Sequence, residues 1–169
     1  KYGDVEFIYN ISVAEADPKG KIQFKANSVK TTAGQRFVLD VFMVDNPGIV
    51  ALKTTLEFDE SVFELKGVTN KMAFESYEDS KETDDGGNIV FESPYQMFWS
   101  SPQATENNTH NGDVISFEFE VKDTKDLSNQ IIKFNFVEAY NKVGTPIGGV
   151  SSKFNIDVCE VKVGDVDGS

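Results

Sequence analysis

Apolar and polar residues alternate with a period of two along several segments of the chain, which is typical of half-buried β-strands. The clearest alternation spans residues 114–121, and residues 132–137 and 153–158 repeat it. Residues 52–58 follow it more loosely. The pattern predicts strands with one buried and one exposed face. In the 52–58 segment the predicted buried residues are Leu52, Leu56 and Phe58, and the predicted exposed residues are Lys53, Thr55 and Glu57.

Turns rich in Gly, Asn and Asp separate these segments, at residues 45–48, 84–88, 107–112 and 144–149. About nine short strands fit between such turns, and helix signals are nearly absent. The 14 Phe residues can fill the layer between two facing sheets. The sequence therefore predicts an all-β fold, a sandwich of two antiparallel sheets.

The predicted sandwich spans residues 21–160. Residues 1–20 are predicted to be a linker or an additional strand, because apolar residues 5–9 precede a linker-like segment at 14–20. Residues 161–169 are predicted to be a polar tail.

The chain carries 28 acidic and 16 basic residues, a formal net charge of -12. This charge repels nucleic acid phosphates and anionic membrane surfaces. No apolar run reaches the roughly 20 residues of a membrane helix, and the first residues lack the apolar stretch of a signal peptide. We therefore expect a soluble protein whose export signal has been removed, monomeric when free, with neither nucleic acid nor membrane as a partner.

Residues with catalytic or metal-binding chemistry are few. Cys159 is the only cysteine, so no intramolecular disulfide and no Cys-based zinc cluster can form, and we predict that it is buried. The only histidine, His110, lies in an Asn/Gly-rich turn and is predicted to be solvated. Residues 57–62 nearly match the E-x-D-x-x-E pattern of one group of jelly-roll glycosidases, but Val62 replaces the last acid and Asp59 is predicted to form a turn. The sequence therefore predicts no enzyme activity and no cofactor.

Residues 22–68 resemble the first four strands of a cohesin in the order and chemistry of their strands and turns. Later pieces that resemble the family are a strand at 89–91, a segment carrying Trp99, a turn at 111–113 and the Phe-alternating strand behind it. The resemblance covers residues 21–160 and is strongest to cohesins of Ruminococcus-type bacteria. It implies a nine-stranded jelly-roll sandwich that binds a calcium-loaded dockerin module in an extracellular bacterial complex that degrades polysaccharides such as cellulose.

The resemblance also implies a binding face on one sheet. The third strand offers Ala51 and Lys53 where the best-known cohesins carry a short Asn/Asp pair, so we expect dockerins of that class to be rejected. The residues predicted to contact the partner are Ala51, Lys53, Thr55, Tyr77, Glu92, Tyr95, Lys133, Val143, Thr145 and Pro146.

The end of the chain resembles the opening of a dockerin calcium loop. Asp165, Asp167 and Ser169 occupy the first three ligand positions, but the loop ends before its turn Gly and its bidentate acid. We therefore expect no calcium site in this chain itself; calcium is expected on the dockerin partner.

Two other functions compete with dockerin binding. A carbohydrate-binding module shares the sandwich architecture, and Tyr95, Phe98 and Trp99 supply aromatic rings on which sugars could stack. A purely structural, immunoglobulin-like spacer domain is the third interpretation.

Overall fold

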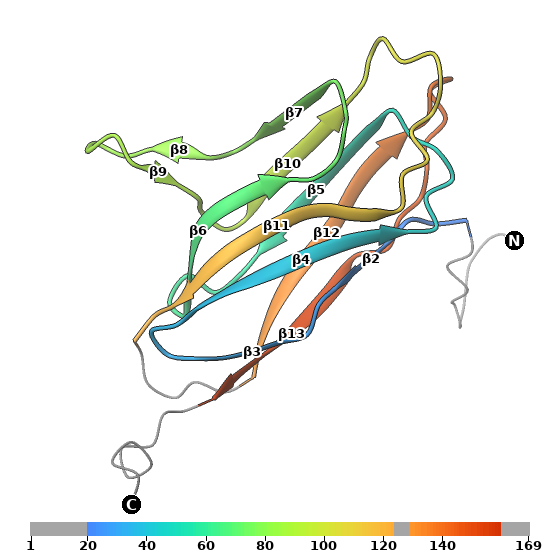
Figure 1. The fold of residues 1–169 in the computed structure, drawn as a ribbon. Helices are drawn as coiled ribbons and strands as arrows, with labels where there is room; N and C mark the ends of the chain where they lie inside the picture. The colour runs from blue at the N-terminus through green and yellow to red at the C-terminus, as the bar shows by residue number, and fades with distance from the viewer. Residues whose placement is uncertain (1–19, 124–128, 160–169) are drawn as a thin grey trace, which may run out of the picture.

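Two β-sheets packed face to face make up the computed structural model, which describes residues 20–123 and 129–159 (Figure 1). The all-β sandwich predicted from the sequence is confirmed. Within these residues no helix is long and apolar enough to cross a membrane.

The four-stranded sheet is antiparallel throughout. Its strands are, in spatial order, β2 (Gln23–Ala26), β4 (Arg36–Val44), β11 (Gly112–Val121) and β6 (Phe63–Asn70). On β11, Phe117 and Phe119 are fully buried while Glu118 and Glu120 point outward, as the alternation predicts. Arg36 on the neighbouring β4 forms ion pairs with both of these glutamates, at 3.2 and 3.5 Å.

The six-stranded sheet carries β5 near its centre. Its strands are, in spatial order, β3 (Val29–Thr32), β13 (Ser152–Cys159), β12 (Gln130–Tyr140), β5 (Ala51–Glu57), β10 (Tyr95–Ser100) and β7 (Ser76–Asp79).

One pairing in the six-stranded sheet departs from the predicted antiparallel arrangement, because β3 runs parallel to β13. The chain leaves the four-stranded sheet after β2 and enters the six-stranded sheet as β3 within two residues. Asn27 holds this crossing, since its side chain donates to Val38 O at 3.1 Å and accepts from the Asp40 backbone at 2.7 Å. The crossing brings β3 beside the last strand, β13.

Aromatic rings join the two sheets. Phe134 of β12 lies 4.7 Å from Phe24 of β2 and 6.3 Å from Phe117 of β11, measured between ring centroids. Phe134 and Phe117 are fully buried, and Phe24 is almost fully buried. Burial of each such side chain contributes about 1.5–3 kcal/mol.

A small two-stranded arm, β8 (Glu82–Thr83) and β9 (Ile89–Val90), extends from the β7 edge of the sandwich (Figure 1). Its tip is the predicted turn at 84–88, where Asp84 accepts the N–H groups of Gly86 and Asn88. The strand predicted at 89–91 as part of the sandwich therefore belongs to this arm. The sandwich strand in this region is β10.

Of three further expectations, one can be compared with the structure. Cys159 is half-buried instead of buried, because it lies at the end of β13 and projects to the outer side of the sheet. The N-terminal segment before Gly20 and the calcium-loop-like tail with Asp165, Asp167 and Ser169 lie outside the described residues.

Candidate functional site

The six-stranded sheet has one side turned away from the four-stranded sheet, and we call this side the outer face. β5 crosses its middle with strict alternation: Leu52, Thr54 and Leu56 are fully buried, and the residues between them point outward. The predicted contact residues Ala51, Lys53 and Thr55 are these outward residues. The predicted exposed side of this strand is therefore correct.

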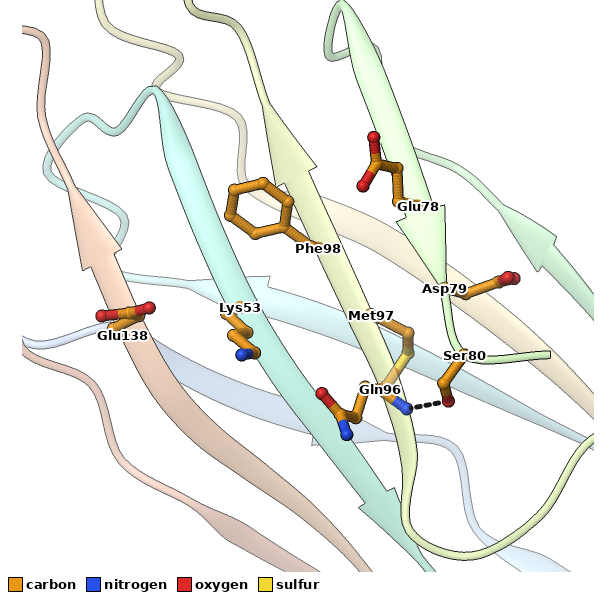
Figure 2. A pocket seen from close by; sticks show the side chains of 8 residues that line it. All are labelled: Lys53, Glu78, Asp79, Ser80, Gln96, Met97, Phe98 and Glu138. Atoms are coloured by element: carbon orange, nitrogen blue, oxygen red, sulfur yellow. Dashed lines mark hydrogen bonds between the residues drawn. The ribbon is translucent and has the colours of Figure 1, made fainter.

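Four strands contribute to a single row across the outer face. Phe98 of β10 pairs with Lys53 on one side and with Glu78 of β7 on the other, and Lys53 also pairs with Glu138 of β12. Figure 2 shows these side chains around a shallow depression of about 420 Å³, in which Gln96 and Ser80 form the neighbouring wall. The depression extends from β12 and β5 over β10 to the edge strand β7, and it combines one aromatic ring with charges of both signs.

Lys53 is the cation of this row. It forms no ion pair with any of the described residues, although Glu138 is its direct cross-strand partner. Glu138 instead accepts a hydrogen bond from the Tyr140 hydroxyl at 3.0 Å, which raises the pKa of Tyr140. The Lys53 ammonium group is thus free to meet a group from outside.

A second row lies further along β5. Asn135 of β12 donates through Nδ2 to Thr55 Oγ1 at 3.2 Å and to Glu57 Oε2, which fixes these polar side chains over the sheet. Lys133, another predicted contact residue, pairs with Glu57 in the register and is exposed on the outer face.

Tyr77 and Tyr95 were both predicted to contact a partner, and the full burial of Tyr95 contradicts the prediction for that residue. Tyr95 is fully buried and Tyr77 is half-buried, because both point inward from their strands. Tyr95 donates to Asp79 Oδ2 at 2.5 Å and bonds to the Tyr77 hydroxyl at 2.9 Å, while the Tyr77 ring packs against Trp99. Burial, followed by the hydrogen bond to Asp79, raises the pKa of Tyr95; burial likewise raises that of Tyr77.

The remaining predicted contact residues lie in loops. Glu92 is exposed in the segment between β9 and β10. Val143 is 76% exposed, and Thr145 and Pro146 are exposed beside it in the β12–β13 loop. Pro146 bridges to Tyr140, which is the cross-strand partner of Ala51, so this loop flanks one end of the outer face.

Sequence reasoning missed Glu78, Gln96 and Glu138 as contact residues, and it considered Phe98 only as a carbohydrate platform. Phe98 and Gln96 point outward from β10, between the buried Tyr95, Met97 and Trp99. Because Phe98 is apolar, the polar and apolar positions of β10 do not alternate. The signal that could have revealed its orientation is the pairing of β10 with β5, which is not local in sequence.

The described residues offer little catalytic chemistry. His110 is held by Asp113, whose backbone oxygen lies 2.8 Å from Nε2. Asp59 accepts from the Ser61 N–H and hydroxyl, which confirms its role as a turn former. Among residues 20–123 and 129–159 no three His, Cys, Asp or Glu side chains gather as metal ligands would.

Comparison with known proteins points to one family. The sequence profile described as "Cohesin domain" matches residues 22–156. No curated protein sequence matches the chain.

Solved structures similar to this one are cohesins. The OlpC cohesin of Clostridium thermocellum, solved with the dockerin Doc435, has 12% identity and a TM-score of 0.64, with 83% of this chain and 95% of that chain covered. The OlpA cohesin of the same organism, solved with Doc918, has 17% identity, a TM-score of 0.62 and coverages of 82% and 99%. The seventh ScaB type I cohesin of Pseudobacteroides cellulosolvens has 16% identity, a TM-score of 0.63 and coverages of 84% and 94%. These similarities show the fold.

Proposed function

The chain belongs to the cohesin family, and we propose that it is a non-catalytic module that binds a calcium-loaded dockerin through the outer face of its six-stranded sheet. The observation that carries this proposal is the depression on that face, over β5, β10 and β7. It is open to solvent, contains the half-buried ring of Phe98, and is lined by Lys53, which has no ion-pair partner among the described residues. Aromatic rings are enriched at the centres of protein interfaces, and an unpaired charge beside one can attract an opposite charge of the partner.

The charge of Lys53 supports a specificity different from that of the best-known cohesins. Those carry a short Asn/Asp pair where this chain has Ala51 and Lys53, and a cation at this point attracts carboxylate or carbonyl groups and repels basic ones. The matching dockerin therefore presents an acidic or carbonyl group to Lys53. Dockerins that offer a basic residue there are rejected.

Carbohydrate binding is less well supported. A sugar-binding platform needs exposed aromatic faces, whereas Trp99 and Tyr95 are both fully buried. The Trp99 indole nitrogen donates to Asn70 Oδ1 at 2.8 Å, and its ring packs against Tyr77. Phe98 alone remains of the three aromatic residues considered.

The wider setting follows from the family. Solved relatives of this chain were crystallised as cohesin–dockerin complexes, so we place the module in an extracellular or cell-surface complex whose other members degrade polysaccharides. The role of this module in the complex is to attach a dockerin-bearing protein to it. The described residues support this, since Val62 is buried where the glycosidase pattern needs an acid.

Calorimetric titration of the chain with the dockerins of one genome tests the proposal. We expect at least one dockerin to bind with one-to-one stoichiometry in calcium, and we expect EDTA to abolish binding because calcium shapes the dockerin. Affinity electrophoresis in soluble glucans provides the comparison. Retardation by a glucan with no dockerin bound would replace this proposal with carbohydrate binding.

A further inference from the structure

Two lysines lie side by side on the outer face, at the opposite end of β5 from Ala51. Lys133 of β12 and Lys153 of β13 are direct cross-strand partners, and both are exposed. Both side chains point outward, because the neighbouring pair Ile132 and Phe154 points toward the core. The two lysine side chains therefore leave the sheet from adjacent positions.

This arrangement is unfavourable in the isolated chain. Like charges directly opposite each other on neighbouring strands destabilise a sheet. Acidic residues outnumber basic ones 28 to 16, so a carboxylate would be the expected neighbour of either lysine. Lys133 has one such neighbour, its cross-strand partner Glu57 on β5, which accepts a hydrogen bond from Asn135 and forms no ion pair with Lys133; Lys153 has a lysine as its partner on β12.

Most of the described cations form no ion pair with a described carboxylate, and three do. Arg36, Lys66 and Lys81 each form an ion pair with a nearby carboxylate. Neither Lys133 nor Lys153 forms one within residues 20–123 and 129–159. The lysine pair lies on the same face as the depression around Lys53.

We propose that the lysine pair Lys133 and Lys153 extends the binding face onto β13 and receives a carboxylate of the dockerin. This inference rests on the proposed function. A carboxylate between the two ammonium groups adds an attraction and also relieves their mutual repulsion, so binding gains from both.

The spacing suits one partner element. Lys53 and Glu57 are four residues apart on β5, a distance of about 14 Å at roughly 3.4 Å per residue. Because Glu57 is in register with Lys133, the lysine pair lies at this distance from the depression. A helix of about ten residues covers 14 Å, so one dockerin helix can contact both places.

The substitution Lys153→Glu distinguishes a role of Lys153 in dockerin binding from a role in the stability of the sheet. The substitution replaces a like-charge pair with an opposite-charge pair, so we expect the thermal midpoint of the free chain to rise by about 1–3 °C. We expect the affinity for the cognate dockerin to fall roughly tenfold at the same time. A gain in stability with a loss of binding is not expected for a residue that only supports the sheet.

Lys25→Glu is the matched control, because Lys25 is an exposed strand residue of the four-stranded sheet and the change in charge is identical. The control should bind the dockerin with an affinity within about twofold of that of the wild type.

Lys153→Gln should bind the dockerin about threefold more weakly than the wild type, and its affinity should depend less steeply on salt concentration.

The titrations are run with the dockerin that binds the wild type most tightly, alongside sedimentation of the free chain. Loss of affinity in Lys153→Glu but not in Lys25→Glu supports the inference. Equal affinity of these two variants overturns it while the proposed function stands. If the wild type binds no dockerin, both the proposed function and the inference are overturned. If the wild type is a dimer in sedimentation and Lys153→Glu abolishes the dimer, the inference is overturned, because the lysine pair then contacts a second copy of this chain.

Discussion

Lys53 on β5 lies directly opposite Glu138 on β12, and this pairing depends on a β-bulge between Phe136 and Glu138. Before the bulge, Asn135 points outward. With strict alternation, Ala139 would point to the same side as Asn135. The bulge shifts the alternation by one residue, so Glu138 points outward and Ala139 is buried, with 1% exposure. A local irregularity of the backbone thus sets the charge beside Lys53.

Replacing Lys53 with Asp tests the centre of the proposed face. The variant adds a third carboxylate to the row that contains Glu78 and Glu138. Breaking a charge pair at a desolvated interface costs about 2–5 kcal/mol, whereas an exposed rim charge contributes about 1 kcal/mol or less. We therefore expect Lys53→Asp to bind the cognate dockerin more than tenfold more weakly in calorimetric titrations.

Glu118→Lys is the control for this substitution. Glu118 points outward from β11 on the four-stranded sheet, where it pairs with Arg36. The variant should bind nearly as tightly as the wild type. If it loses binding while Lys53→Asp keeps it, the dockerin binds the other sheet.

Phe98 is expected to supply apolar contact in the same row. Truncation of an aromatic residue at the centre of an interface typically costs about 2 kcal/mol or more. Phe98→Ser should therefore reduce dockerin affinity by at least roughly tenfold, measured by calorimetry. Val38→Ser, on the opposite sheet, removes an apolar side chain that is 48% exposed and should leave the affinity unchanged; equal losses in both variants would contradict the assignment.

The outward side of β5 could be predicted from the sequence because alternation is a local property. A strand with Leu52, Thr54 and Leu56 toward the core must place Lys53 and Thr55 on the other side. The family resemblance then predicted that this side is the binding face. The same reasoning correctly placed Lys133 on the exposed side of its strand.

The rest of the face depends on features that alternation does not encode. On β10, apolar side chains point to both sides, so Tyr95 and Phe98 could not be assigned to opposite faces without the pairing to β5. On β12, the bulge reverses the expected orientation of Glu138. Tyrosine is common at protein interfaces, which favoured Tyr77 and Tyr95 as contact residues. In the structure the Tyr95 hydroxyl donates to Asp79 and bonds to the Tyr77 hydroxyl inside the molecule.

Gly149 is expected to be essential for stability because the ring of Phe136 occupies the space that a side chain at position 149 would need. Gly149→Ala forces the ring or the backbone to move, and such overpacking costs about 1–3 kcal/mol. Urea unfolding should show this loss. Gly148→Ala is the control, since its added methyl group would meet only the flexible Lys21 side chain, and an equal loss in both variants would contradict the explanation.

Asp59 is expected to make a pH-dependent contribution to stability. Hydrogen bonds from the Ser61 hydroxyl and N–H lower the pKa of Asp59 below its ordinary value of 3.8. A lowered folded-state pKa stabilises the native state at pH values above 3.8, and this contribution disappears as the pH falls through the folded-state pKa. Asp59→Ala should therefore be less stable than the wild type at pH 7, and the difference should shrink below pH 3.8. Chemical unfolding across this range measures it; a difference that stays constant would show that the charge plays no part.

Tyr95→Phe should reduce stability without changing dockerin affinity. The Tyr95 hydroxyl donates to Asp79 and bonds to the Tyr77 hydroxyl, and its removal leaves the Asp79 side chain, 8% exposed, with Lys81 at 3.9 Å as its remaining ion-pair partner. Leaving a buried acceptor without its donor costs about 1–3 kcal/mol, which urea unfolding can resolve. Tyr77→Phe should cost less, because Tyr95 keeps its bond to Asp79. Affinity should hold in both variants since the hydroxyl groups point inward; a loss of affinity with unchanged stability would return Tyr95 to the binding face.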